Sequence, residues 1–145
     1  MKRIILSAFF IIALCVAPLS SSNSHHLTAE GSPGWIRFWG NGTVTLSGKG
    51  TLIVKNMSNM RFEVKGEHVE SNKIADGFEY RHFEGSVSAV GMGMHMELRG
   101  WNLKIDVEGS GKAHFSGKGT YSLDGKAPVK WAEKYGDWTK IRFRK

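Results

Sequence analysis

The stretch GTVTLSGKGTLIVKNMSNMRFEVKG, residues 42–66, decides the fold class because the chain contains it twice. It aligns without a gap on GSVSAVGMGMHMELRGWNLKIDVEG, residues 85–109, and a half-unit at 109–125 repeats its SGKGT segment. Apolar and polar residues alternate in each copy, which is typical of half-buried β-strands. Each copy also carries Gly-x-Gly inside a strand, where glycine marks a bulge or a sharp bend.

This repeat predicts an all-β domain: an antiparallel meander of glycine-bent strands that closes as a small β-barrel or a rolled β-sandwich. We expect turns at 56–59, 99–102 and 124–125, so that each full unit is a strand, a turn and a strand. At most one short C-terminal helix is predicted, at 128–135, because its first residue is a proline and a glycine follows its last.

The N-terminus has the pattern of an export signal. Two basic residues precede an apolar run at 4–19, and a zone of small residues follows it. We expect a signal peptide at 1–22, cleaved near Ser22, and a mature chain in the periplasm or the extracellular space. The single cysteine, Cys15, leaves with the signal, so packing alone has to stabilise the domain.

The rest of the chain is predicted to be a flexible lead-in at 23–34 and one β-domain at 35–145, with an insert at 67–84 that lies outside the repeat. The sequence has 20 Lys and Arg against 13 Asp and Glu, a formal charge of +7. This excess suits an anionic envelope polymer, an anionic surface or a protein partner. Nucleic acid is not an expected partner of an exported chain.

The insert supplies a first candidate site. If it folds as a hairpin about residues 72–77, His68 lies across from His82 and Glu70 lies across from Tyr80. Such a cluster could hold a ligand or zinc, or could act as a general acid/base pair. The alternative is a solvated hairpin whose cross-strand charges only stabilise the sheet.

A second candidate site is the segment with Met92, Met94, His95 and Met96. Thioether and imidazole ligands suit Cu(I). In a strand, however, the three methionines point to one face and His95 points to the other. This geometry argues against a copper site and favours an apolar core stripe, because methionine commonly fills irregular cores.

Trp35 and Trp39 form the third candidate, since they share one side of the first expected strand and could stack a sugar ring. Ile36 and Phe38 on the other side favour the alternative, a strand that is buried on both faces.

No motif in the chain identifies a reaction. The SGKGT segments lack the first glycine, the hydroxyl residue after the lysine and the following helix of a phosphate loop. Asn41 and Asn56 begin N-glycosylation sequons. We therefore expect an exported non-catalytic β-domain without a cofactor, a binding or structural module of the cell envelope or the extracellular space that could self-associate through strand edges. Two alternatives remain: a metal-binding protein or metal carrier with a Met/His site, and a small outer-membrane β-barrel.

Overall fold

The computed structural model describes residues 24–67, 70–134 and 136–144. The expected signal peptide at 1–22 and its cleavage point near Ser22 lie outside the described residues.

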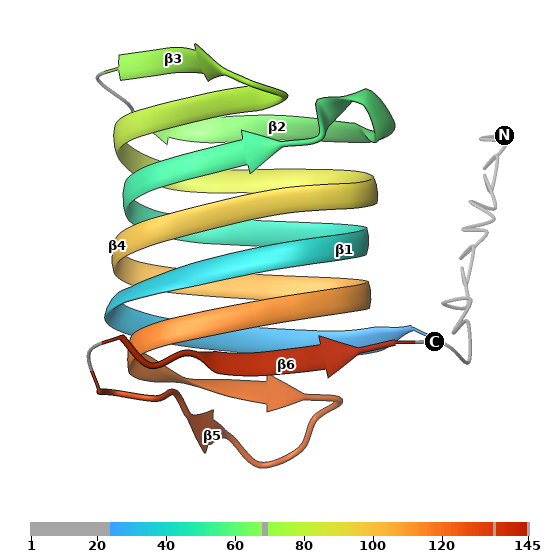
Figure 1. Ribbon diagram of the computed structural model, residues 1–145, viewed down its shortest axis with the longest axis vertical. Coiled ribbons are helices and arrows are strands. Elements are labelled where there is room, and N and C mark those ends of the chain that lie inside the picture. The colour runs from blue at the N-terminus through green and yellow to red at the C-terminus, as the bar shows by residue number, and fades with distance from the viewer. Residues whose placement is uncertain (1–23, 68–69, 135, 145) are drawn as a thin grey trace, which may run out of the picture.

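Two long antiparallel strands, β1 (His25–Lys55) and β4 (Gly77–Leu123), coil together around one core (Figure 1). Trp35 of β1 pairs with Arg99 on one side and with Ser116 on the other, so β1 lies between successive turns of β4. The remaining elements are η1 (Met57–Asn59), β2 (Met60–Glu67), β3 (Glu70–Ile74), β5 (Val129–Lys130) and β6 (Thr139–Phe143), and the four short strands all pair with β4.

The coil is flattened, so its one antiparallel sheet has two facing halves. We call the half that faces the reader in Figure 1 the front sheet and the other half the back sheet. The front sheet consists, in spatial order, of β3, 77–81, 51–55, 95–99, 35–39, 111–115 and β6. The back sheet consists of β2, 84–91, 42–49, 103–109, 25–31, 119–123 and β5. The predicted all-β fold and rolled sandwich are confirmed, whereas the sheet does not close into a barrel.

Glycines occupy the bends between front and back segments, as the repeat predicts. At one bend Gly50 pairs with Gly100, and both have positive φ angles. A Cβ atom on Gly100 would lie 1.9 Å from the carbonyl oxygen of Lys49, and one on Gly50 would lie 2.0 Å from that of Arg99. Neighbouring turns can therefore approach this closely only without side chains.

Two sequence predictions about the chain path are wrong. Residues 25–34, expected as a flexible lead-in, belong to β1, and Leu27 and Ala29 are buried in the core. The hairpin turn expected at 99–102 is instead a bend within the continuous strand β4. At this bend Gly100 lets two neighbouring windings of the coil approach each other closely. The turns at 56–59 and 124–125 are confirmed.

The C-terminal stretch closes the lower end of the coil. No α-helix occurs in the described ranges, and β5 stands where the short helix was expected. Trp131 follows β5, is 2% exposed, and stacks on Phe115 with ring centroids 5.1 Å apart. In the part of the chain that the structure describes, no helix has the length and apolar character needed to cross a membrane.

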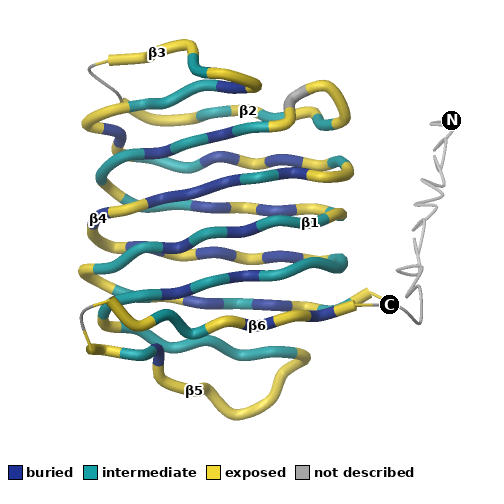
Figure 2. The backbone as a smooth tube through the Cα atoms, in the orientation of Figure 1, coloured by how far each residue is buried: buried dark blue, intermediate teal, exposed yellow. Residues whose placement is uncertain are grey.

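Burial alternates along both long strands (Figure 2), as expected for strands with one face on a core. The inward side chains of β1 and β4 are almost all apolar: Leu27, Ile36, Phe38, Val44, Leu46, Leu52, Val54, Phe83, Val87, Met94, Met96, Leu98, Leu103, Ile105, Val107 and Phe115. The residues between them point outward. The outward side chains of adjacent strand segments therefore form a continuous outer face on each half of the coil.

Candidate functional site

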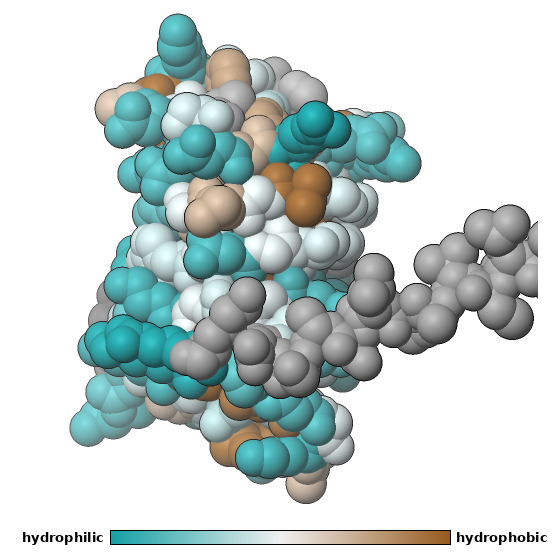
Figure 3. Space-filling model, turned by 90° about the vertical axis from the view of Figure 1, so that its right-hand side faces the viewer, coloured by the Kyte–Doolittle hydropathy of each residue, from teal (hydrophilic) through white to brown (hydrophobic). Residues whose placement is uncertain are grey.

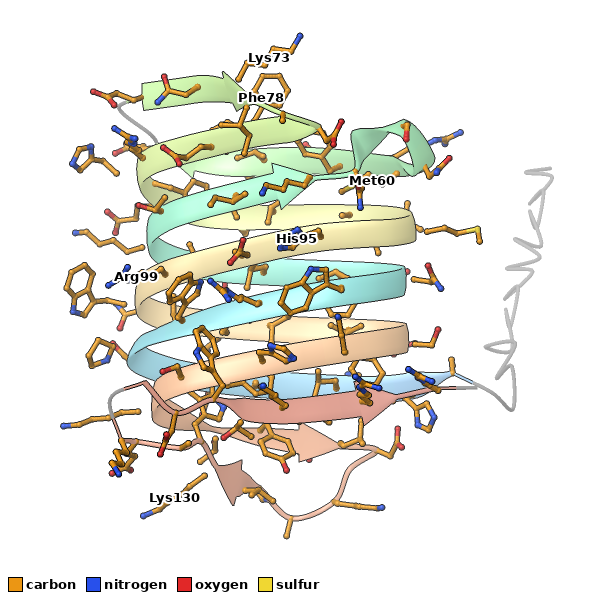
Figure 4. The ribbon with its side chains drawn as sticks, viewed as in Figure 1. Met60, Lys73, Phe78, His95, Arg99 and Lys130 are labelled. Atoms are coloured by element: carbon orange, nitrogen blue, oxygen red, sulfur yellow. The ribbon has the colours of Figure 1, made fainter. Side chains whose placement is uncertain are left out.

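Four adjacent front-sheet segments, 95–99, 35–39, 112–116 and 138–142, carry aromatic and basic residues at their outward positions. Figure 4 labels two of these residues, His95 over the front of the coil and Arg99 at its left-hand edge. We call the whole set the aromatic–cation face: Trp35, Arg37, Trp39, His95, Glu97, Arg99, Lys112, His114, Trp138, Lys140 and Arg142.

Indole rings contact two of the three arginines of the face, Arg37 and Arg99. The guanidinium carbon of Arg37 lies 4.0 Å from the ring centroid of Trp35 and 4.7 Å from that of Trp138. Arg99 lies over the same Trp35 ring at 5.0 Å. Cation–π attraction of this kind orders a guanidinium group without neutralising its charge.

Trp39 has a similar role for the neighbouring groups. Its ring stacks on His95 with centroids 4.9 Å apart, meets His114 edge-on at 4.9 Å, and lies 4.8 Å from the Lys112 ammonium. Trp35 and Trp39 are half-buried on the outer surface, so the expectation of a strand buried on both faces is wrong. Imidazoles and cations surround these indoles. A ligand on this face would therefore meet positive charge before it met an open aromatic ring.

Glu97 is the carboxylate beneath these groups and is only 8% exposed. Its two oxygens lie 2.6 Å from Arg37 Nε and 3.2 Å from His95 Nε2. Burial alone would raise the pKa of Glu97, but its contact with His95 and the charge of Arg37 outweigh burial and lower that pKa. Glu97 is therefore ionised at neutral pH and fixes both partners against the sheet.

The other cations of the face have no such partner. Arg99, Lys112, Lys140 and Arg142 lie within ion-pair distance of no carboxylate among the described residues. Elsewhere in the described ranges some cations are paired, as Lys49 is with Glu84 at 3.6 Å and Lys65 with Glu63 at 3.8 Å, and others are not. The unpaired cations of the face differ in that they lie together on adjacent segments. The aromatic–cation face thus has a positive charge that the protein itself does not compensate.

Replacing Glu97 by glutamine should lower the free energy of unfolding by about 2 kcal/mol, because the half-buried Arg37 loses its counter-charge. Glu108→Gln, at an exposed back-sheet position without an ion pair in the described ranges, should change it by less than about 0.5 kcal/mol. Urea unfolding at several pH values measures both.

The difference in the free energy of unfolding between wild type and Glu97→Gln should depend on pH. The folded-state pKa of Glu97 lies below its ordinary value of 4.5, so its contribution is complete above that value and is lost as the pH falls through the lower folded-state pKa. The difference between wild type and Glu97→Gln should shrink in acid. A difference that is already absent at neutral pH would contradict the assigned role.

The candidate site in the insert does not form as expected. His68 lies outside the described residues. The hairpin turns at 75–76, one residue away from the assumed register, so Glu70 pairs with Arg81 and not with Tyr80. A shift of one residue moves a side chain to the opposite face. Glu70 forms an ion pair with Arg81 at 3.9 Å, and His82 is exposed at a positive φ angle. Tyr80 faces the upper end of the core, where burial raises its pKa.

The Met/His candidate is divided between two sides of the sheet. Met94 and Met96 are buried in the core, whereas His95 lies on the aromatic–cation face. Met92 is 67% exposed because Gly93, at a φ of 62°, interrupts the alternation that would have turned it inward. Among the described residues, no group of three or more His, Cys, Asp or Glu side chains is arranged to hold a metal ion.

The bend at Gly93 uses both sequon asparagines. The Gly93 amide donates to Asn41 Oδ1 at 2.7 Å, and Asn56 Nδ2 donates to the Gly93 carbonyl at 2.8 Å. Val90 and Met92, close to this bend, are exposed. Figure 3 shows the side of the coil that lies at the right in Figure 1, where the described surface is mainly hydrophilic or neutral with isolated hydrophobic spots. These asparagines thus have a structural role that their sequon pattern did not indicate.

The back sheet carries an open hollow of about 400 Å³. Small side chains such as Thr28, Thr45 and Thr120 line it together with Lys104 and Asp106. Positive and negative groups are mixed there, in contrast to the aromatic–cation face.

No family model, no curated protein and no solved structure matches this chain.

Sequence analysis identified Trp35, Trp39 and His95 but missed four other members of the face: Arg37, Glu97, His114 and Trp138. The available signal was the alternation itself. In each of the four segments, every second residue is aromatic, basic, histidine or Glu97, apart from Ser116. This alternation marks each segment by itself, but which segments lie side by side follows only from the strand pairing.

Proposed function

We propose that this protein is an exported, non-catalytic binding module whose aromatic–cation face binds a linear anionic polymer of the cell envelope or the extracellular space. The observation that carries the proposal is the charge of the face. Arg37, Arg99, Lys112, Lys140 and Arg142 lie on adjacent segments, with Glu97 as the single carboxylate of the face among the described residues. Such a surface attracts a chain of repeated acidic groups.

The way in which the cations are held supports a binding role. Ordering a long basic side chain on binding costs about 0.5–1.5 kcal/mol, and the indoles of Trp35, Trp39 and Trp138 reduce this cost by holding their cations in place beforehand. The face also lies on the outside of a sheet and not in a cleft. Its carboxylate is already engaged by Arg37 and His95, so it does not offer a free acid/base pair.

The test uses the mature chain, polygalacturonate as the anionic polymer and neutral dextran as its control. At low ionic strength the chain should bind polygalacturonate and not dextran. The affinity should fall by about tenfold or more when salt is raised from about 0.05 M to about 0.5 M, because salt screens exposed charges. Equal binding to both polymers, or affinity that does not change with salt, would contradict the proposal.

A further inference from the structure

His114 is a histidine of the aromatic–cation face whose neighbours are basic side chains and indole rings. It sits in the middle of the segment 112–116, where its Cα partners are Arg37 of β1 and Lys140 of β6. The Trp39 ring lies 4.9 Å from its imidazole and the Trp138 ring 6.3 Å from it. The imidazole makes no hydrogen bond or ion pair with any residue that the structure describes.

The charged groups that face His114 all have the same sign. They are Arg37 from β1, Lys112 from the same segment of β4, and Lys140 and Arg142 from β6. Glu97 is one segment further away and is engaged by Arg37 and His95. Partial burial and these four cations lower the pKa of His114, so the imidazole is neutral at pH 7.

An anionic group that docks among these cations reverses the local potential. Before binding, a proton on His114 would add a fifth positive charge to an uncompensated cluster. After binding, the same proton would lie beside an oxyanion and would be stabilised by it. The geometry therefore couples the charge of the ligand to the charge of this one side chain.

We propose that His114 is the proton-linked position of the face: an acidic group of the bound polymer docks between Arg37, Lys112 and Lys140, and His114 takes up one proton from solvent as it does. This inference rests on the proposed function, since it concerns the same face. It adds that the polymer binds more tightly in mildly acidic surroundings than in neutral ones.

Linkage fixes the sign of the effect. If ligand binding favours the protonated imidazole, then protonation favours ligand binding by the same factor. Affinity should rise as the pH falls below the pKa that His114 has in the complex, and it should stop rising below the lower pKa of the free protein. The expected gain between about pH 8 and about pH 5 is about tenfold, within the usual range for coupling between two sites.

The probe for this experiment is dextran sulfate, whose sulfate groups do not titrate between neutral and mildly acidic pH. Isothermal titration calorimetry at about pH 6, in two buffers of different ionisation enthalpy, should show uptake of about half a proton or more per protein molecule that binds the polymer. Affinities at several pH values give the tenfold gain independently.

Three variants assign the proton to its residue. His114→Gln should bind weakly with no pH dependence, and His114→Lys should bind at about pH 8 as tightly as wild type does at about pH 5. His26→Gln, on the back sheet beside Asp106, should behave as wild type. Far-ultraviolet circular dichroism checks that each variant folds, and the wild-type calorimetry requires no variant at all.

The outcomes separate this inference from the function on which it rests. If wild type fails to bind dextran sulfate at every pH, the proposed function itself is contradicted. If wild type binds without proton uptake, or if His114→Gln keeps the proton uptake, only the proton-linked role of His114 is overturned.

Discussion

Replacing Gly100 by alanine should lower the free energy of unfolding by about 3 kcal/mol or more, and the protein should unfold at a clearly lower temperature. The new Cβ atom would lie 1.9 Å from the carbonyl oxygen of Lys49, and the backbone at φ 154° disfavours any side chain. The clash is with backbone, so no side chain can move aside to relieve it. Thermal and urea unfolding of the two proteins measure the loss.

Gly93→Ala is the matched control because it also places alanine at a positive φ angle, 62°, but meets nothing within 4 Å. It should cost only about 1 kcal/mol, the price of the left-handed conformation. If Gly100→Ala proves no less stable than Gly93→Ala, the close approach of successive turns is not what requires glycine at the bends.

Much of the fold follows from local patterns in the sequence. The period-two alternation from Val44 to Val54 and from Leu103 to Val107 predicts strands with one apolar side, and those residues do line the core. The repeated Gly-x-Gly predicts the bends. Alternation and glycine spacing are visible in one sequence because each depends on residues that are close together along the chain.

The path of the chain was harder to predict, as the bend at Gly100 illustrates. A glycine followed by Asn102 has the composition of a hairpin turn, and short turns make neighbouring strands pair with each other. Here the segments before and after the bend lie on opposite halves of the coil, and each pairs with β1. Local composition does not distinguish a hairpin from a corner, because the difference lies in which distant strand accepts the hydrogen bonds.

The candidate site escaped prediction for the same reason. Lys140, His114, Arg37 and Glu97 form one row across the front sheet, yet they come from four separate places in the chain. Only the coil brings them together: Trp35 of β1 pairs with both Arg99 and Ser116 of β4, which are 17 residues apart in the chain. The Trp39 and Trp35 side chains were recognised individually, but their meaning depends on neighbours that the sequence does not place.

Reversing three charges of the aromatic–cation face should strongly weaken polymer binding. In the triple variant Lys112→Glu, Lys140→Glu and Arg142→Glu, the affinity for polygalacturonate should fall by about 100-fold or more. Each basic group near an anionic surface contributes about 1 kcal/mol, and reversal adds repulsion to that loss. None of the three has a carboxylate partner among the described residues, so the fold should keep its stability.

The control reverses the same number and kind of charges on the back sheet, with Arg61→Glu, Lys65→Glu and Lys104→Glu. Both triple variants have the same net charge, so any difference between them reports where the charges lie. The back-sheet variant should bind within about threefold of wild type, since its substitutions are distant from the bound polymer. Equal losses in both variants would mean that only total charge matters.

Nuclear magnetic resonance of the isotopically labelled protein, titrated with short polygalacturonate fragments, tests the location of binding most directly. The amide and side-chain signals that shift should map to the front-sheet segments 35–39, 95–99 and 112–116 and to 138–142, with the indole N–H signals of Trp35, Trp39 and Trp138 among the most affected. Shifts confined to the back-sheet segments 25–31, 42–49 and 103–109 would contradict the assignment of the aromatic–cation face as the binding site.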